Sequence, residues 1–137
     1  MNNYCPIQNS KCGGPSYNPE KWELSVDDHE INNCYSYVMN IMETDIIEKR
    51  QPGEKCNLEF EYDCKNIEKM MQCDFPSITK LDNIDTEIPC DHYRIALVLD
   101  KKGEHLDYHF YRQDLNGYWS HKTGHDPITN LDASNNI

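Results

Sequence analysis

The chain lacks the features that mark exported, membrane-spanning and nucleic-acid-binding proteins. Its first twenty residues hold no basic segment followed by an apolar run, and nowhere do about eighteen apolar residues follow one another. Only 13 of its 137 residues are Lys or Arg against 24 Asp or Glu, a formal charge of -11 that disfavours general phosphate binding. We expect a protein that binds neither nucleic acid nor membrane and lies in the cytoplasm or in a virion.

Close Cys-x₂-Cys pairs, which are typical of structural zinc sites, are also missing. The tight pairs of possible ligands are Cys90-Asp91-His92 and His121-x₃-His125. Two separate pairs without a repeated spacing do not make a zinc motif. We therefore expect no metal and no cofactor.

Seven cysteines are nevertheless present in this short chain. An odd number cannot pair completely, and a reducing compartment keeps thiols free, so we expect most of them to be buried or idle thiols. In an oxidising compartment or a virion, Cys5 could instead pair with Cys12, or Cys56 with Cys64, since each pair closes a small loop.

The residue pattern divides the chain into an irregular segment, 1–24, and one domain, 25–137. The first segment is rich in Asn, Pro, Gly and Ser, and Trp22 and Leu24 are its expected anchors to the core. The second part contains no repeat and no linker, and a chain of this length buries one core. Helical patterns come first and strand patterns follow, which indicates an α+β fold.

A first helix is predicted over residues 31–46. Its apolar residues are spaced by four, three, four and four positions, as on one helix face: Ile31, Tyr35, Val38, Met42 and Ile46. A cap at Asn32 or Asn33 would place Cys34 in the first turn, whereas a capping box starting at Ser25 would place Cys34 inside the helix. The helix should end before the breaker Gln51-Pro52-Gly53.

The remaining elements are one helix and three strands. Asp63 is the expected cap of a second helix that ends near Phe75-Pro76. Residues 93–99, apolar on both faces, predict a central strand, and 105–113 and 118–123 predict two more, with a turn at 114–117. The strands follow one another closely, so we expect an antiparallel meander.

Cys34 and His109 are the candidates for chemistry. Cys34 is the cysteine at a predicted helix start, where unpaired N–H groups lower a thiol pKa. His109 lies in the middle of an aromatic strand and could hold the proton of that thiol. The alternative is a buried cysteine and a histidine at the edge of the core.

The turn at 114–117 decides which residue faces His109. A type I turn with Gly117 in the left-handed conformation pairs Gln113 with Trp119, and His109 and His121 then share a face. A two-residue turn would place Ser120 opposite His109 instead. His121 is therefore the candidate for orienting the imidazole, with Asp114 and Asn130 as further candidates.

Three blocks resemble a group of small proteins of bacteria and large DNA viruses. They are Asn-Cys-Tyr-Ser-Tyr at 33–37, Gln-Pro-Gly at 51–53 and Tyr-His-Phe-Tyr-Arg-Gln-Asp-Leu-Asn-Gly-Tyr-Trp-Ser-His-Lys-Thr-Gly at 108–124. This group is similar to compact papain-like cysteine peptidases of the NlpC/P60 type. The resemblance covers roughly residues 21–137.

The resemblance implies a papain-like domain in which N-terminal helices pack on an antiparallel meander. It also implies a thiol hydrolase, a cysteine peptidase or amidase, with Cys34 as nucleophile, His109 as base and His121 as the orienting residue, acting on a peptide or protein substrate. Two alternatives stay open. The chain could be a non-catalytic interaction protein with this fold, or a small binding protein stabilised by zinc or disulfides.

Overall fold

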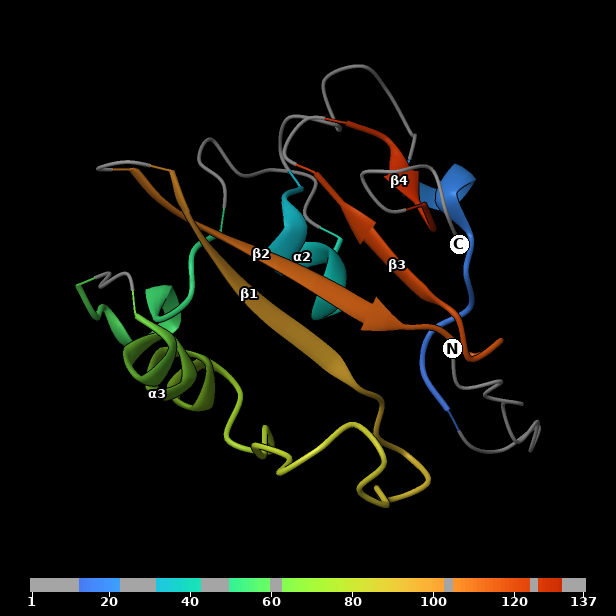
Figure 1. The fold of residues 1–137 in the computed structure, drawn as a ribbon, viewed down its shortest axis with the longest axis horizontal. Helices are drawn as coiled ribbons and strands as arrows, with labels where there is room; N and C mark the ends of the chain where they lie inside the picture. The colour runs from blue at the N-terminus through green and yellow to red at the C-terminus, as the bar shows by residue number, and fades with distance from the viewer. Residues whose placement is uncertain are drawn as a thin grey trace.

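The described part of the chain forms an antiparallel sheet with two α-helices. The computed structural model describes residues 13–22, 32–42, 50–59, 63–102, 105–123 and 126–131. The elements, in chain order, are η1 (Pro19–Trp22), α2 (Cys34–Val38), η2 (Glu54–Cys56), α3 (Cys64–Asp74), β1 (Ile95–Lys102), β2 (His105–Gln113), β3 (Trp119–Lys122) and β4 (Ile128–Thr129). The strand order is β1-β2-β3-β4, and each neighbouring pair is antiparallel (Figure 1).

The α+β, papain-like fold class that we expected is wrong. The described part of the chain is mostly β, and its α-helices are only α2, with five residues, and α3, with eleven. No layer of N-terminal helices covers the meander among these residues, and α3 lies next to β1 (Figure 1). The chain therefore forms a small β-rich protein stabilised by a disulfide, Cys56–Cys73.

The first helix is short because Asn40 closes it. Asn40 adopts a left-handed φ of 56°, and Ile41 N–H donates to Ser36 O at 3.0 Å. Together with the bond from Asn40 N–H to Tyr37 O, also 3.0 Å, this is the Schellman arrangement that ends a helix. The apolar spacing continues to Met42, but neither Ile41 nor Met42 is helical. Ile31, Ile46 and the alternative start at Ser25 lie outside the described residues.

The two N-terminal caps that the sequence suggests are confirmed. Asn33 caps α2, with its Oδ1 accepting Ser36 N–H at 3.0 Å. Asp63 caps α3 in the same way, with its Oδ1 accepting Asn66 N–H at 2.9 Å. Each cap satisfies a donor that the helix itself leaves unpaired. Cys34 is therefore the first residue of α2, and Phe75 ends α3 as expected.

The bulged register of the β2–β3 hairpin is also confirmed. Gln113 pairs with Trp119, and Arg112 pairs with Ser120. Gly117 has a φ of 83° and its N–H donates to Asp114 O at 2.9 Å, which is the left-handed turn residue that this register needs. The strand expected to be central, β1, instead lies at the end of the strand order, where Val98 is 45% exposed.

Aromatic side chains from α2 and β2 form the centre of the core. Tyr35 of α2 contacts Phe110 of β2 with ring centroids 5.5 Å apart. Trp22 packs edge-on against Tyr37 at 5.1 Å, so its predicted role as an anchor of the first segment is confirmed. Leu24 lies outside the described residues. The core positions α2 across β2 and β3, and this fixes where Cys34 lies.

Candidate functional site

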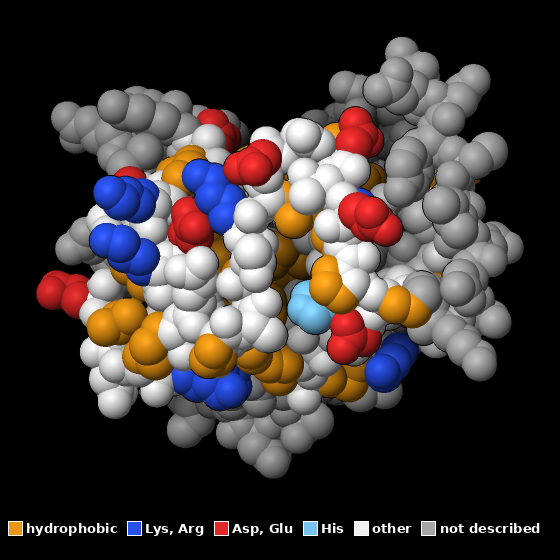
Figure 2. Space-filling view, turned by 90° about the horizontal axis from the view of Figure 1, so that it is seen from below, with side chains coloured by type: hydrophobic (Ala, Val, Ile, Leu, Met, Phe, Trp, Pro, Cys, Tyr) orange, Lys and Arg blue, Asp and Glu red, His pale blue; other side chains and the backbone are white. Residues whose placement is uncertain are grey.

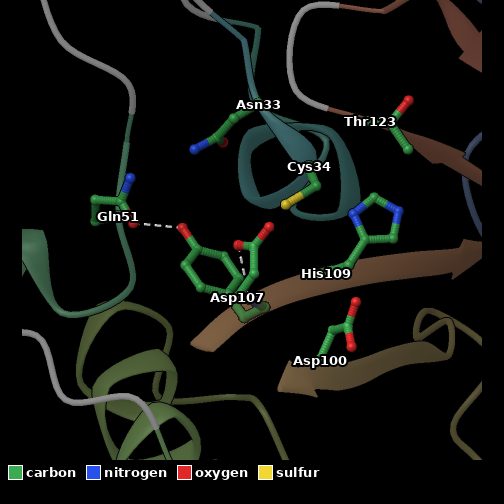
Figure 3. A pocket seen from close by; sticks show the side chains of 8 residues that line it. Asn33, Cys34, Gln51, Asp100, Asp107, His109 and Thr123 are labelled. Carbon is green, nitrogen blue, oxygen red and sulfur yellow. Dashed lines mark hydrogen bonds between the residues drawn. The ribbon is translucent and has the colours of Figure 1, made fainter. Parts of the chain in front are cut away.

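Cys34 is held at the N-terminal end of α2 by its neighbour Asn33. The Asn33 side chain caps the helix through Oδ1 and donates from Nδ2 to Arg50 O at 2.6 Å. Cys34 itself is 7% exposed, and its sulfur points into a pocket (Figure 3). One short helix thus fixes the position of the thiol.

His109 and His121 lie together, as the bulged register predicts. His109 Nε2 and His121 Nδ1 are 2.8 Å apart, and His121 Nε2 is 2.7 Å from Leu131 O. A carbonyl oxygen can only accept, so His121 Nε2 carries a proton. In the neutral ring Nδ1 then accepts, and His109 Nε2 is the donor. His109 Nδ1 is left as an acceptor, and it is the ring nitrogen on the side of Cys34 (Figure 3).

Across the pocket from His109 lies Gln51, the first residue of the segment 51–56, which Asp74 anchors. The carboxylate of Asp74 is 4% exposed and accepts Gly53 N–H at 2.8 Å, Lys55 N–H at 3.1 Å and Tyr35 O–H at 2.6 Å. Gly53 has a φ of 87°, and a Cβ there would meet Met70 at 3.0 Å. Glycine is therefore required at the point where this segment turns past α3.

A disulfide between Cys56 and Cys73 joins the same segment to the last turn of α3. The expected pairing of Cys56 with Cys64 is wrong, because η2 packs at the C-terminal end of α3 and Cys64 lies about 14 Å away at its start. Cys90 is also disulfide-bonded, whereas Cys34 and Cys64 are free thiols. The expectation that most cysteines are free is therefore wrong, and the pair Cys5–Cys12 lies outside the described residues.

These walls enclose a pocket of about 380 Å³. Figure 3 shows its side chains, which come from α2, the segment 51–56, β1, β2 and the end of β3. The lining residues are Asn33, Cys34, Gln51, Asp100, Asp107, Tyr108, His109 and Thr123. Gln51 Oε1 accepts the hydroxyl of Tyr108, which links the two walls. The pocket thus brings Cys34 and His109 together, with His121 behind His109.

The Cys34 thiol and the His109 imidazole are both neutral at physiological pH. Burial, with a smaller contribution from Asp107, raises the pKa of the Cys34 thiol to about 11. Burial and the neighbouring His121 lower the pKa of His109 to about 4. No hydrogen bond joins the Cys34 sulfur to either ring nitrogen among the interactions of the described residues. The resting site therefore holds a thiol and an imidazole rather than a thiolate–imidazolium pair.

The other two candidates for the orienting role lie elsewhere. Asp114 is buried and its Oδ1 accepts Arg112 Nε–H at 2.7 Å, so it neutralises a buried cation. Asn130 contacts Tyr17 through a backbone hydrogen bond. His121 is thus the residue that contacts His109, while the catalytic roles of Cys34, His109 and His121 stay a prediction.

Sequence reasoning missed Asp74 and Gln51. Asp74 ends a helix and shows no local motif, and its three partners come from two distant segments. Gln51 was predicted only as part of the breaker and of a resembling block, with no role in the site. The short Gln-Pro-Gly block was the available signal, because a glycine after proline marks a turn with a left-handed residue.

Metal and membrane features are absent from the residues described above. No group of three or more His, Cys, Asp or Glu side chains in these ranges is arranged to hold a metal ion, and His125 lies outside them. None of the helices that the structure describes is long and apolar enough to span a bilayer.

Comparison with known proteins gives one informative relative. No protein-family model matches the chain, and no solved structure matches it. Insoluble matrix shell protein 1 of Ruditapes philippinarum is 37% identical over 120 residues, which cover 86% of this chain and 72% of that protein. The chain belongs to the family of this shell matrix protein. The shared length includes most of the chain, so the relationship is not confined to one motif.

This membership corrects the expected class of protein. We expected a hydrolase, a viral cysteine peptidase, but the relative is by name a matrix protein of the shell. The resemblance of the three sequence blocks to NlpC/P60 proteins is not tested by these comparisons and stays a prediction.

Proposed function

We propose that the protein is a non-enzymatic, disulfide-stabilised component of an insoluble extracellular matrix. The observation that carries this proposal is the 37% identity to an insoluble matrix shell protein over 86% of the chain. At this identity and coverage, the two proteins are expected to share their fold. The same relationship supports an extracellular location, which we propose in place of the cytoplasmic or virion location expected from the sequence.

The disulfides support an oxidising compartment. The Cys56–Cys73 disulfide joins the segment 51–56 beside the pocket to the last turn of α3, and Cys90 is disulfide-bonded as well. Structural disulfides persist in secreted proteins and are rare where glutathione keeps thiols reduced. The acidic composition, with a formal charge of -11, suits a basic partner within such a matrix.

The resting state of the pocket supports a non-enzymatic role. A thiol nucleophile needs a lowered pKa, whereas burial raises the pKa of Cys34 to about 11. His109, with its pKa lowered to about 4, is a poor acceptor for the thiol proton. The ion pair that would activate Cys34 is therefore unfavourable in this arrangement.

The test is sequential extraction of the tissue that makes the protein. Free thiols are first blocked with iodoacetamide, and the material is then extracted with saline, with denaturant, and with denaturant plus reductant. Mass spectrometry measures the chain in each fraction. We expect it in the extracellular material that saline leaves behind, with the peptides of Cys56 and Cys73 joined until reductant is added.

Two results would contradict the proposed function. If saline releases the chain together with cytosolic proteins, and Cys56 and Cys73 are alkylated before any reductant is added, the matrix role is wrong. Amide-bond cleavage by the purified oxidised protein that is lost in Cys34→Ser would overturn the non-enzymatic part alone.

A further inference from the structure

The pocket beside Cys34 has an acidic mouth. Asp100 of β1 and Asp107 of β2 are direct cross-strand partners, so their side chains leave the sheet on the same face, and both line the pocket. Like charges directly opposite each other destabilise a sheet, so a cation near both carboxylates is favourable. Asp100 already has another interaction partner, so Asp107 is the carboxylate on which binding would depend. No Lys or Arg is among the described residues that line this pocket.

Asp107 is the more available of the two carboxylates. It is exposed, and its Oδ1 accepts the backbone N–H of Tyr108 at 2.9 Å. The interactions recorded for the described residues give Asp107 no ion pair. Figure 2 shows a hollow on one face of the molecule, with hydrophobic side chains inside it and both acidic and basic side chains around it.

The pocket lining presents acceptors, as well as donors such as Gln51 Nε2 and the S–H of Cys34. Asp107 offers carboxylate oxygens, and His109 offers Nδ1, because Nε2 donates to His121. The sulfur of Cys34, 7% exposed, points into the pocket and has no hydrogen-bonded side chain. The charged side chains of this lining are carboxylates, so a matched ligand brings positive charge and hydrogen-bond donors.

We propose that this pocket binds the cationic side chain of a basic peptide segment, a lysine ammonium or an arginine guanidinium. Either group carries only donors. The carboxylate of Asp107 pairs with the charge, and Asp100 adds to the attraction. The volume of about 380 Å³ lies within the range for ligand pockets, about 300–1,000 Å³, so it has room for one such side chain. The methylene stem would contact Cys34 and Tyr108.

A calcium ion fits this lining poorly. Calcium takes six to eight oxygen ligands, whereas the inner part of this pocket presents a neutral imidazole and a thiol. The net charge of -11 adds a general attraction for basic partners, and a test must separate this attraction from binding in the pocket. The inference does not depend on the matrix role, and failure of one leaves the other standing.

The experiment is calorimetric titration of the full, oxidised chain with capped peptides of Gly and Tyr around one central residue. That residue is lysine, norleucine, arginine or citrulline, so each cation has a neutral match of similar shape. We expect at least one cationic peptide to bind roughly tenfold more tightly than its match, because one charge-assisted hydrogen bond has about this effect. Comparing the lysine and arginine arms shows which group the pocket prefers.

Three variants locate the binding. Asp107→Asn should weaken binding of the cationic peptide roughly tenfold, and Asp107→Glu should retain most of it. The matched control is Asp82→Asn, which removes the same charge from an exposed residue that does not line the pocket. It should change the affinity by less than about twofold. Equal thermal unfolding of all variants shows that each has folded.

Several results would overturn the proposal. One is equal affinity for the cationic and neutral peptides, or no binding up to ~1 mM peptide. Another is the same loss in Asp82→Asn as in Asp107→Asn, which would reduce the effect to net charge. Calcium or zinc chloride that binds stoichiometrically and displaces the peptide would assign the pocket to a metal instead.

Discussion

The two walls of the pocket are held by different chemistry. On one side, the segment 51–56 is fixed by the Cys56–Cys73 disulfide and by two hydrogen bonds to the buried carboxylate of Asp74, which also accepts a hydrogen bond from Tyr35 of α2. On the other, β2 and β3 are joined through two imidazoles, His109 and His121, and a backbone carbonyl. The first wall depends on a covalent bond and on hydrogen bonds to a carboxylate, and the second depends on the neutral ring of His109.

This difference predicts that the walls respond to different conditions. Reductant and loss of the Asp74 carboxylate should loosen the first wall. Protons should act on the second, because a buried imidazole resists charge more than an exposed one. Each prediction below separates one wall from the other.

Asp74→Ala should have the largest effect. It leaves the donors of Gly53, Lys55 and Tyr35 without their acceptor, and each buried donor left unpaired costs about 1–3 kcal/mol. Water can form hydrogen bonds with some of these donors and so reduce the cost. We therefore expect a loss of about 3–5 kcal/mol in the free energy of unfolding, measured by urea denaturation of the oxidised protein.

The matched control for Asp74 is the exposed Asp82→Asn, which should stay within about 0.5 kcal/mol of the wild type. Asp74→Asn should lie between the two, because it keeps one acceptor oxygen. A loss below about 1 kcal/mol in Asp74→Ala would show that this wall does not depend on the carboxylate.

Removing the disulfide should have the next largest effect. The bond joins residues 17 positions apart, and closing a loop of about this length in the unfolded chain is worth about 3 kcal/mol. The double variant Cys56→Ser, Cys73→Ser should lose about this amount in urea denaturation. Cys64→Ser, which removes an exposed free thiol, should unfold like the wild type. Equal stability of the double variant and the wild type would contradict the role of the disulfide.

The two free thiols should differ in reactivity. Cys64 is exposed, whereas Cys34 is buried and burial raises its pKa from 9.0 to about 11. The thiolate fraction of Cys34 is then roughly a hundredfold smaller than that of an ordinary thiol near neutral pH. Iodoacetamide labelling of the oxidised protein, followed by mass spectrometry, should therefore modify Cys64 first.

The reverse order would have a specific meaning. If Cys34 reacts faster than Cys64 near pH 6, and His109→Ala slows only Cys34, the thiol is activated by the imidazole. The catalytic roles predicted for Cys34, His109 and His121 would then be supported, and the non-enzymatic part of the proposed function would be wrong.

The features that the sequence predicted correctly are local. Asn33 and Asp63 cap helices through bonds to residues three positions away, and Gly117 closes the hairpin that brings His109 to His121. The extent of the first helix was wrong because Asn40 ends it while the apolar spacing continues. A left-handed residue ends a helix whatever the pattern beyond it, and Asn adopts this conformation at little cost.

The features that the sequence did not predict are nonlocal. Asp74 bonds to Tyr35, 39 positions away, and to Gly53, 21 positions away, and neither spacing has a pattern that a sequence displays. The partner of Cys56 depends on which end of α3 meets η2, so loop length alone selected the wrong cysteine. The helix layer that the resemblance implied failed for the same reason, because packing partners are set by the whole chain.

The smallest predicted effect is the pH response of the second wall, which contains His109 and His121. Burial and His121 lower the pKa of His109 from 6.5 to about 4, so the unfolded chain binds a proton first as the pH falls. The stability from the neutral ring is complete above about pH 6.5 and is lost on the way to about pH 4. His109 is half-buried, and screening reduces the full value of about 3 kcal/mol to ~1–2 kcal/mol.

Urea denaturation at pH 7 and at pH 4.5 tests this sign. His109→Gln should lose much of the difference between the two pH values, whereas the exposed pair His92–Asp91 should matter little, so His92→Gln should keep it. An unchanged difference in His109→Gln would mean that the ring is not held neutral by its surroundings. Because Cys56–Cys73 does not titrate, the double cysteine variant should keep the same pH difference at lower overall stability, which would show that the two walls are independent.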